Sequence, residues 1–157
     1  MTVQPFISTD RAPPPMILTP SDVNRLLVDD SHDSRLGVLE KVAAHYNNES
    51  FHGREREIAE QIFRLLSKDV TLRVREVLAD RLKANPNIPR DVVLQLANDV
   101  ESVALPVVEA SLVLSDADLV SIIEASHDMS KLVAISRREN VSGRVSDALV
   151  ETQYPQV

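Results

Sequence analysis

The stretch that decides the fold is ANPNIPRDVVLQLANDVE, residues 84–101. A helix-forming run ends at Asn85, because Pro86 has no backbone N–H to donate and disfavours helical angles at the residue before it. A new helix follows Pro89, which suits the first turn of a helix because its missing N–H costs nothing there. Asp91 lies in the same turn, where the helix dipole favours a negative charge. The stretch therefore predicts a tight joint between two helices.

The same kind of joint recurs along the chain. The stretch VLSDADLVSII, residues 113–123, offers Ser115 as an N-cap with an acid three residues later, which is typical of a capping box. Asp69, Asp99 and Asp128 each precede a predicted helix and are 30 and 29 residues apart. Self-similarity at about this period predicts stacked helix pairs.

Between the joints, apolar residues recur at helical spacing and predict amphipathic helices. The clearest apolar stripes run over residues 36–46, 58–66 and 70–82. A competing interpretation takes DVVLQL, SVALPVV and LVSIIEA as strands, because Val and Ile favour them. Three glycines are few for the turns that paired strands need, so helices are favoured. Pro106 should kink or shorten any helix that starts near Glu101.

Length and composition bound the possibilities further. A chain of 157 residues fits one domain, and the absence of cysteine excludes disulfides and thiolate metal sites. No apolar run is long enough to cross a bilayer, and residues 1–16 lack the pattern of a secretory signal, so we expect a cytoplasmic protein. Five of the nine prolines lie in the first 20 residues. We therefore expect a flexible, disordered Pro-rich tail over residues 1–19, a helical-repeat domain over 20–152 and a short tail over 153–157.

The charge is unevenly distributed. The net charge is −7, yet residues 51–90 carry nine bases and six acids, while residues 91–157 carry four bases and eleven acids. Some helical-repeat proteins bind duplexes in a basic groove, so nucleic-acid binding is one alternative function. The bases of the middle segment alternate with acids, however, which is typical of solvated helix faces with local ion pairs. The acidic balance also opposes affinity for phosphate.

Residues 69–82, DVTLRVREVLADRL, resemble a helix of a HEAT-type repeat. The pattern is an Asp, four intervening residues and then Val-Arg, which here are Asp69, Val74 and Arg75. HEAT proteins commonly join successive turns by a ladder of Asp and Arg. The positions that match Arg75 later in the chain are apolar, namely Leu105 and Ala134. The resemblance therefore implies a single Asp–Arg tie, from Arg75 to Asp69 or Asp99, with apolar packing for the rest.

Two further resemblances point to the same fold. Residues 84–99 resemble the linker and second helix of leucine-rich-variant repeats, and residues 103–151 are similar to an uncharacterised bacterial family built of such repeats, known by a domain-of-unknown-function label. Together they imply an all-α chain, a right-handed α-solenoid of about four stacked helix pairs. They imply no activity.

Candidate chemistry is sparse. The four histidines form no His-x-x-x-His pattern, so a metal site is not expected. No Gly-x-Ser-x-Gly elbow or phosphate-binding glycine loop is present. We therefore expect a protein that is not an enzyme and needs no cofactor.

The remaining expectation is a protein–protein interaction scaffold or adaptor that uses the surface of the solenoid. A protein partner or a second copy in a homodimer would bind there, and the proposed contacts are Arg54, Arg73, Arg137 and Arg138. A small-molecule-binding or enzymatic member of an uncharacterised family is a further alternative. The residues assigned structural roles are Asp69, Arg75, Pro89, Asp99 and Ser115.

Overall fold

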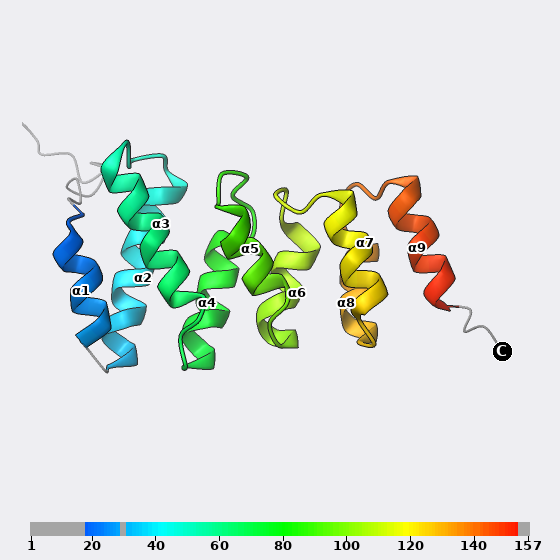
Figure 1. The fold of residues 1–157 in the computed structure, drawn as a ribbon, viewed down its shortest axis with the longest axis horizontal. Helices are drawn as coiled ribbons and strands as arrows, with labels where there is room; N and C mark the ends of the chain where they lie inside the picture. The colour runs from blue at the N-terminus through cyan, green and yellow to red at the C-terminus, as the bar shows by residue number, and fades with distance from the viewer. Residues whose placement is uncertain (1–17, 29–30, 154–157) are drawn as a thin grey trace, which may run out of the picture.

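The computed structural model describes residues 18–28 and 31–153, and over these residues the chain forms nine α-helices (Figure 1). Their bounds are α1 Pro20–Val28, α2 His32–Asn47, α3 Arg54–Leu66, α4 Leu72–Leu82, α5 Arg90–Ala97, α6 Glu101–Ala110, α7 Asp116–Ala125, α8 Met129–Ser136 and α9 Gly143–Gln153. Most of the tail expected over residues 1–19, and of that over 153–157, lies outside the described residues.

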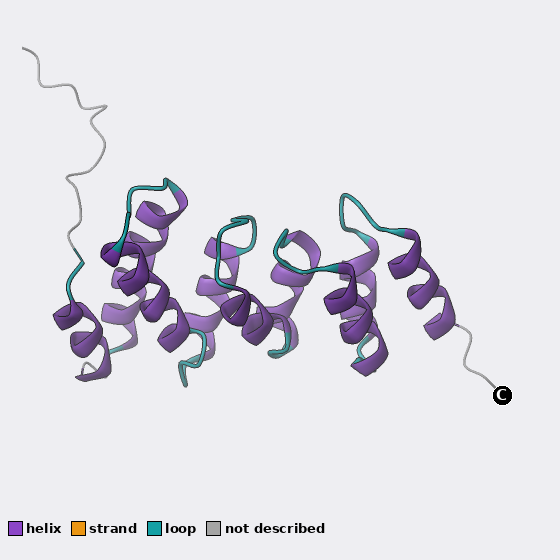
Figure 2. Cartoon of the chain, turned by 45° about the horizontal axis from the view of Figure 1, so that its top comes forward, coloured by secondary structure: helices purple, strands orange, loops and turns teal. Residues whose placement is uncertain are grey.

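No strand occurs in the described part of the chain (Figure 2). The Val- and Ile-rich stretches that could be taken for strands lie in α5, α6 and α7, so the strand interpretation is wrong. Pro106 lies inside α6, which continues to Ala110. None of these helices is long and apolar enough to cross a membrane, in the part of the chain that the structure describes.

The helices form two layers along an elongated molecule (Figure 1). In the even-numbered layer, α2 packs on α4, α4 on α6 and α6 on α8. In the odd-numbered layer, α1 packs on α3, α3 on α5 and α7 on α9. The loops that follow α2, α4, α6 and α8 lie along one edge, which we call the upper edge, and those that follow α3, α5 and α7 lie along the lower edge (Figure 1).

The core between the layers is aliphatic, with a single aromatic contact of note. Leu78, Val103 and Ile135 are fully buried, and each comes from an even-numbered helix. The ring of Tyr46 meets that of Phe63 edge-on at 5.1 Å between centroids. One stripe residue is misplaced by the sequence pattern: Val70 lies before α4 and is exposed, because α4 begins only at Leu72.

The predicted joints are confirmed in their local geometry. Ser115 is the N-cap of α7, and Asp118 completes a capping box with it. Pro89 is the N-cap of α5 and accepts the N–H groups of Val92 and Val93 at its carbonyl. The polar turn residues thus satisfy backbone groups that a helix end would otherwise leave unpaired.

Candidate functional site

Two Arg–Asp pairs join successive helices of the even-numbered layer near the lower edge. Arg75 Nε lies 2.8 Å from Asp99 Oδ2, and Arg75 Nη1 donates to the backbone carbonyl of Asp69 at 2.7 Å. Arg35 Nε lies 2.8 Å from Asp69 Oδ2, and its Nη2 donates to Thr71 Oγ1 at 3.3 Å. The expected tie from Arg75 to Asp99 is therefore confirmed. The expectation of a single tie is wrong, because Arg35 of α2 supplies a second.

Two more Arg–Asp pairs join the odd-numbered helices. Arg64 of α3 binds Asp91 of α5 through both carboxylate oxygens, with Nε 2.7 Å from Oδ2. Arg90 of α5 binds Asp118 of α7, also through two oxygens. Hydrogen bonds from these arginines hold the pKa of each carboxyl below its usual value, opposed by partial burial. At Asp118, the backbone N–H of Ser115 adds to the effect.

These pairs explain the uneven charge of the sequence. Three of the four connect an arginine of the basic middle segment to an aspartate of the acidic segment after residue 90. Three local pairs of the kind expected from alternation also form in the described ranges: Arg56 with Glu60, and Lys83 and Arg81 with Asp80. The basic excess of residues 51–90 is therefore largely neutralised within the fold rather than displayed as one cationic surface.

The structure does not bring the four predicted partner-binding arginines together. Arg54 opens α3 after the upper-edge loop, whereas Arg73 lies in the first turn of α4 after a lower-edge loop (Figure 1). Only Arg137 and Arg138 are neighbours. Arg54, Arg73 and Arg137 are exposed and form no ion pair among the residues that the structure describes.

Arg138 has an intramolecular role. Its Nη1 donates to the carbonyl of Val108 at 2.7 Å and its Nη2 to that of Ser111 at 2.6 Å. These carbonyls end α6, where a cation also complements the helix dipole. Burial lowers the pKa of Arg138, since the charged form loses hydration there. Arg138 thus fastens the loop after α8 to the end of α6.

Arg137 points to a different environment, a hollow between α6 and α8. Leu105, Met129 and Val133 supply its apolar lining, and Glu109 and Arg137 supply its charges. Glu109 and Arg137 also line an adjoining hollow at the upper edge, which includes Leu112. Met129 is 63% exposed and Leu112 is 70% exposed. We call these six residues the α6–α8 surface.

The apolar part of the α6–α8 surface was missed by sequence reasoning. Met129, Val133 and Arg137 are four residues apart, so they share one side of α8. That spacing is visible in the sequence, but it is equally typical of the buried side of a helix. Only the packing of α8, which buries Ala134 and Ile135 instead, identifies the exposed side.

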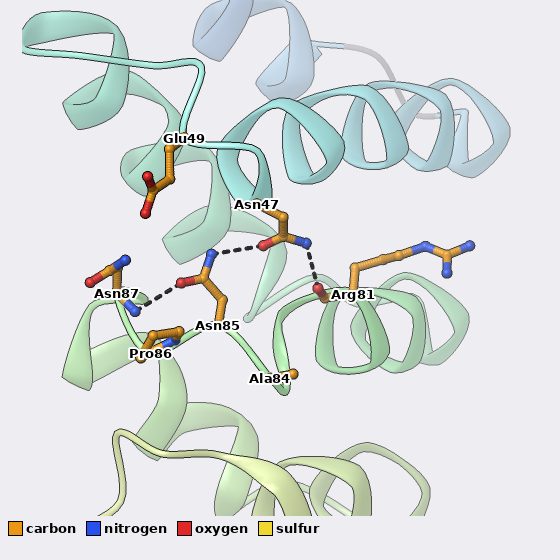
Figure 3. Close-up of a pocket in the computed structure, with 7 residues that line it drawn as sticks. All are labelled: Asn47, Glu49, Arg81, Ala84, Asn85, Pro86 and Asn87. Carbon is orange, nitrogen blue, oxygen red and sulfur yellow. Dashed lines mark hydrogen bonds between the residues drawn. The ribbon is translucent and has the colours of Figure 1, made fainter.

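A third hollow lies at the upper edge between the loop after α2 and the loop after α4 (Figure 3). Asn85 Nδ2 donates to Asn47 Oδ1 at 2.8 Å, and Asn47 Nδ2 donates to the carbonyl of Arg81 at 2.8 Å. The backbone N–H of Asn87 donates to Asn85 Oδ1 at 2.8 Å. Glu49, with φ of 56°, extends over the same hollow (Figure 3). Asn85 therefore fastens the loop after α4 to the end of α2.

Tyr46, at the end of α2, also bonds to the loop after α4. Its hydroxyl oxygen lies 2.9 Å from both Glu60 Oε2 and the carbonyl of Asn87, and Arg56 stacks over its ring at 5.4 Å. Burial, followed by the hydrogen bond to Glu60, raises the pKa of Tyr46 to about 12. Most polar groups of the hollow are thus engaged in holding the fold.

No group of three or more His, Asp or Glu side chains in the described ranges could hold a metal ion. Comparison with known proteins adds one finding. Residues 103–157, which include most of α6 and all of α7 to α9, match a family described as an uncharacterised protein conserved in bacteria (DUF2336). The chain matches no curated protein and no solved structure. The resemblance of the C-terminal part to an uncharacterised bacterial family is therefore confirmed.

Proposed function

We propose that the two layers form a short right-handed α-solenoid of the HEAT and leucine-rich-variant kind, and that it serves as a non-catalytic protein-binding scaffold in a bacterial cytoplasm. Each even-numbered helix packs on the next, as expected when helix pairs stack in one direction. The Arg–Asp pairs between successive helices resemble the ladder of HEAT proteins. Stacked helix pairs of this kind create extended surfaces on which other proteins can bind.

The observation that carries the proposal is the α6–α8 surface. Met129 and Val133 expose apolar area around a hollow that Leu105 also lines, and Leu112 does so at the adjoining hollow. Exposed apolar groups gathered at one place with polar groups at the margin are typical of protein contact sites. An amphipathic helix of a partner would place its apolar side in this hollow.

Glu109 and Arg137 would orient the partner. They have opposite charges and line both adjoining hollows. Charges at the margin of a contact affect the rate and direction of association more than the final affinity. Arg137 would therefore bind a carboxylate of the partner, and Glu109 would bind a basic side chain. Arg138 is not part of this contact, because its guanidinium is engaged at the end of α6.

The pairing of the arginines weighs against the nucleic-acid alternative. Arg64, Arg75 and Arg90 each bind an aspartate through two oxygens, so a phosphate would have to displace a carboxylate. Affinity for a duplex depends on bases that release counterions on binding. The exposed bases Arg54 and Arg73 open helices at opposite edges and do not form one track.

The test is capture of protein partners, identified by mass spectrometry, with the wild-type chain and with Met129→Asp and Arg137→Glu. Lys68→Glu is the matched control, because Lys68 is an exposed base on the loop between α3 and α4. We expect the same partner with the wild type and the control, and its loss with Met129→Asp. Equal capture by all four proteins would refute a contact at the α6–α8 surface. A salt-sensitive shift of DNA or RNA would favour the alternative.

A further inference from the structure

The two ends of the molecule carry complementary surfaces. At the N-terminal end, a hollow of about 390 Å³ lies between α1 and α2. Leu26, Gly37 and Val38 form its apolar part, and Arg25 and Lys41 stand at its margin. A methyl group built on Gly37 would meet no atom within 4 Å, so the floor is open at this point. We call this hollow the α1–α2 groove.

The α1–α2 groove lies on the side of α2 that faces away from the rest of the even-numbered layer. Glu40 and Asn47 of α2 bond to Arg81 of α4, which fixes the inner side of the helix. Lys41 lies roughly 100° or more around the helix from Glu40 and Asn47, and Gly37, one turn before Lys41, lies roughly 60–80° from them. The flank of α2 beside the groove therefore has no even-numbered neighbour in the described residues.

The charge of the α1–α2 groove is basic, because Arg25 and Lys41 form no ion pair within the ranges that the structure covers. Leu27 and Val28, at the end of α1, are also exposed, Val28 to 81%, but they do not line the groove. Asp22 also lines the groove, but its carboxylate accepts from the N–H of Thr19 at 2.8 Å.

The C-terminal end presents the opposite pattern on α9. Val145 and Ala148 are buried against the core, so the other side of the helix is free. Asp147, Val150 and Glu151 occupy that side, and Val150 is 52% exposed. Neither acid forms an ion pair with a described residue. An apolar residue beside two carboxylates thus lies on α9, at the end of the molecule opposite to the groove (Figure 1).

Arg144 lies on the exposed side of α9 and is basic, unlike the two acids there. It lies one turn before Asp147 and forms no ion pair among the described residues. Asp22 is likewise the exception at the α1–α2 groove. The two surfaces are therefore complementary in their main charges, and the one residue of opposite sign on each, Arg144 and Asp22, is complementary as well.

We propose that α9 of one copy docks in the α1–α2 groove of a second copy. Asp147 and Glu151 would meet Arg25 and Lys41, while Val150 would enter the apolar part of the groove. The two surfaces lie at opposite ends, so the contact is head-to-tail and leaves one free surface of each kind. Open chains would result, growing with concentration. The contact area is distinct from the α6–α8 surface, so self-association and partner binding are independent.

The test is sedimentation velocity of the full chain over a concentration series, at low and at high salt. One variant reverses the groove (Arg25→Glu with Lys41→Glu), and another reverses the helix (Asp147→Lys with Glu151→Lys). The matched control, Lys68→Glu with Arg73→Glu, makes the same change of charge elsewhere. We expect the wild type and the control to increase in mass with concentration. Each reversal alone should weaken association at least about tenfold, because like charges then meet.

Mixing the two reversed variants is the decisive measurement. The acidic groove of one then faces the basic α9 of the other, and the unchanged surfaces also match, so the mixture should regain the wild-type mass. Circular dichroism of each variant checks that the helices are retained. A wild type that stays monomeric at every concentration would overturn the proposal. So would association that both reversals leave unchanged, or a mixture that does not recover.

Discussion

The Arg–Asp pairs differ in burial, which makes their energies predictable. Arg75 and Asp99 have side chains that are 18% and 10% exposed, whereas Arg64 and Asp91 are 44% and 59% exposed. Both pairs join neighbouring helices of one layer and both use two carboxylate oxygens. The two pairs therefore have the same chemical groups and differ in how far water reaches them.

The expected coupling energies follow from this difference. Hydrogen bonds to charged groups contribute about 1.5–3 kcal/mol when water is largely excluded. Exposed ion pairs contribute about 0.2–1 kcal/mol. We expect about 2 kcal/mol for Arg75 with Asp99 and about 0.5 kcal/mol for Arg64 with Asp91. Asp99→Asn keeps an acceptor for the N–H of Val100, so the change isolates the charge.

The assay is urea unfolding in two double-mutant cycles, one with Arg75→Met and Asp99→Asn, the other with Arg64→Met and Asp91→Asn. The slope of free energy against urea must stay constant, because separate unfolding of helix pairs would invalidate the comparison. In 1 M salt, the coupling of the exposed pair should disappear while that of the buried pair persists. Equal coupling energies in the two cycles would refute the argument from burial.

Three other outcomes follow from the site. Arg138→Met should destabilise the chain by about 1–3 kcal/mol, and hydrogen exchange should show α8 and α9 affected more than α3, because two carbonyls at the end of α6 lose their donor. The lowered pKa values of Asp91 and Asp118 make their contribution to stability complete above about pH 4, and denaturation curves should show it lost as the pH falls through their folded-state pKa values. With its pKa raised to about 12, Tyr46 should stabilise the fold fully below about pH 10 and lose that effect as the pH rises to 12. Absorbance titration should show the delayed ionisation in the wild type and not in Tyr46→Phe; stability that is unchanged between pH 10 and 12 would contradict it.

The helices were predictable because their ends are encoded locally. Pro86 and Pro89 interrupt helical hydrogen bonding whatever their tertiary surroundings. Ser115 caps α7 through Asp118, which is only three positions away. The start of α4 was not encoded so clearly. Val70 continues the apolar spacing of its helix, yet the backbone turns at Asp69, whose side chain accepts the N–H of Thr71 at 2.8 Å.

The site was less predictable because it depends on contacts between distant segments. Arg35 and Asp69 are 34 residues apart, and nothing near either residue indicates its partner. Arg137 and Arg138 are adjacent in sequence, yet one is exposed and the other is anchored under the end of α6. Their sequence positions do not reveal which arginine is exposed, because the difference arises from the direction in which each side chain leaves the end of α8.

All four Arg–Asp pairs run in the same direction along the chain. In each, the arginine precedes the aspartate by 24 to 34 residues, so the segments at α4 and α5 each offer a cation to the segment after them and an anion to the one before. This gives the row of helices a polarity that apolar packing alone would lack. Segments that meet in this head-to-tail orientation keep opposite charges at their joint, whereas two segments that met head to head would bring together surfaces of like charge.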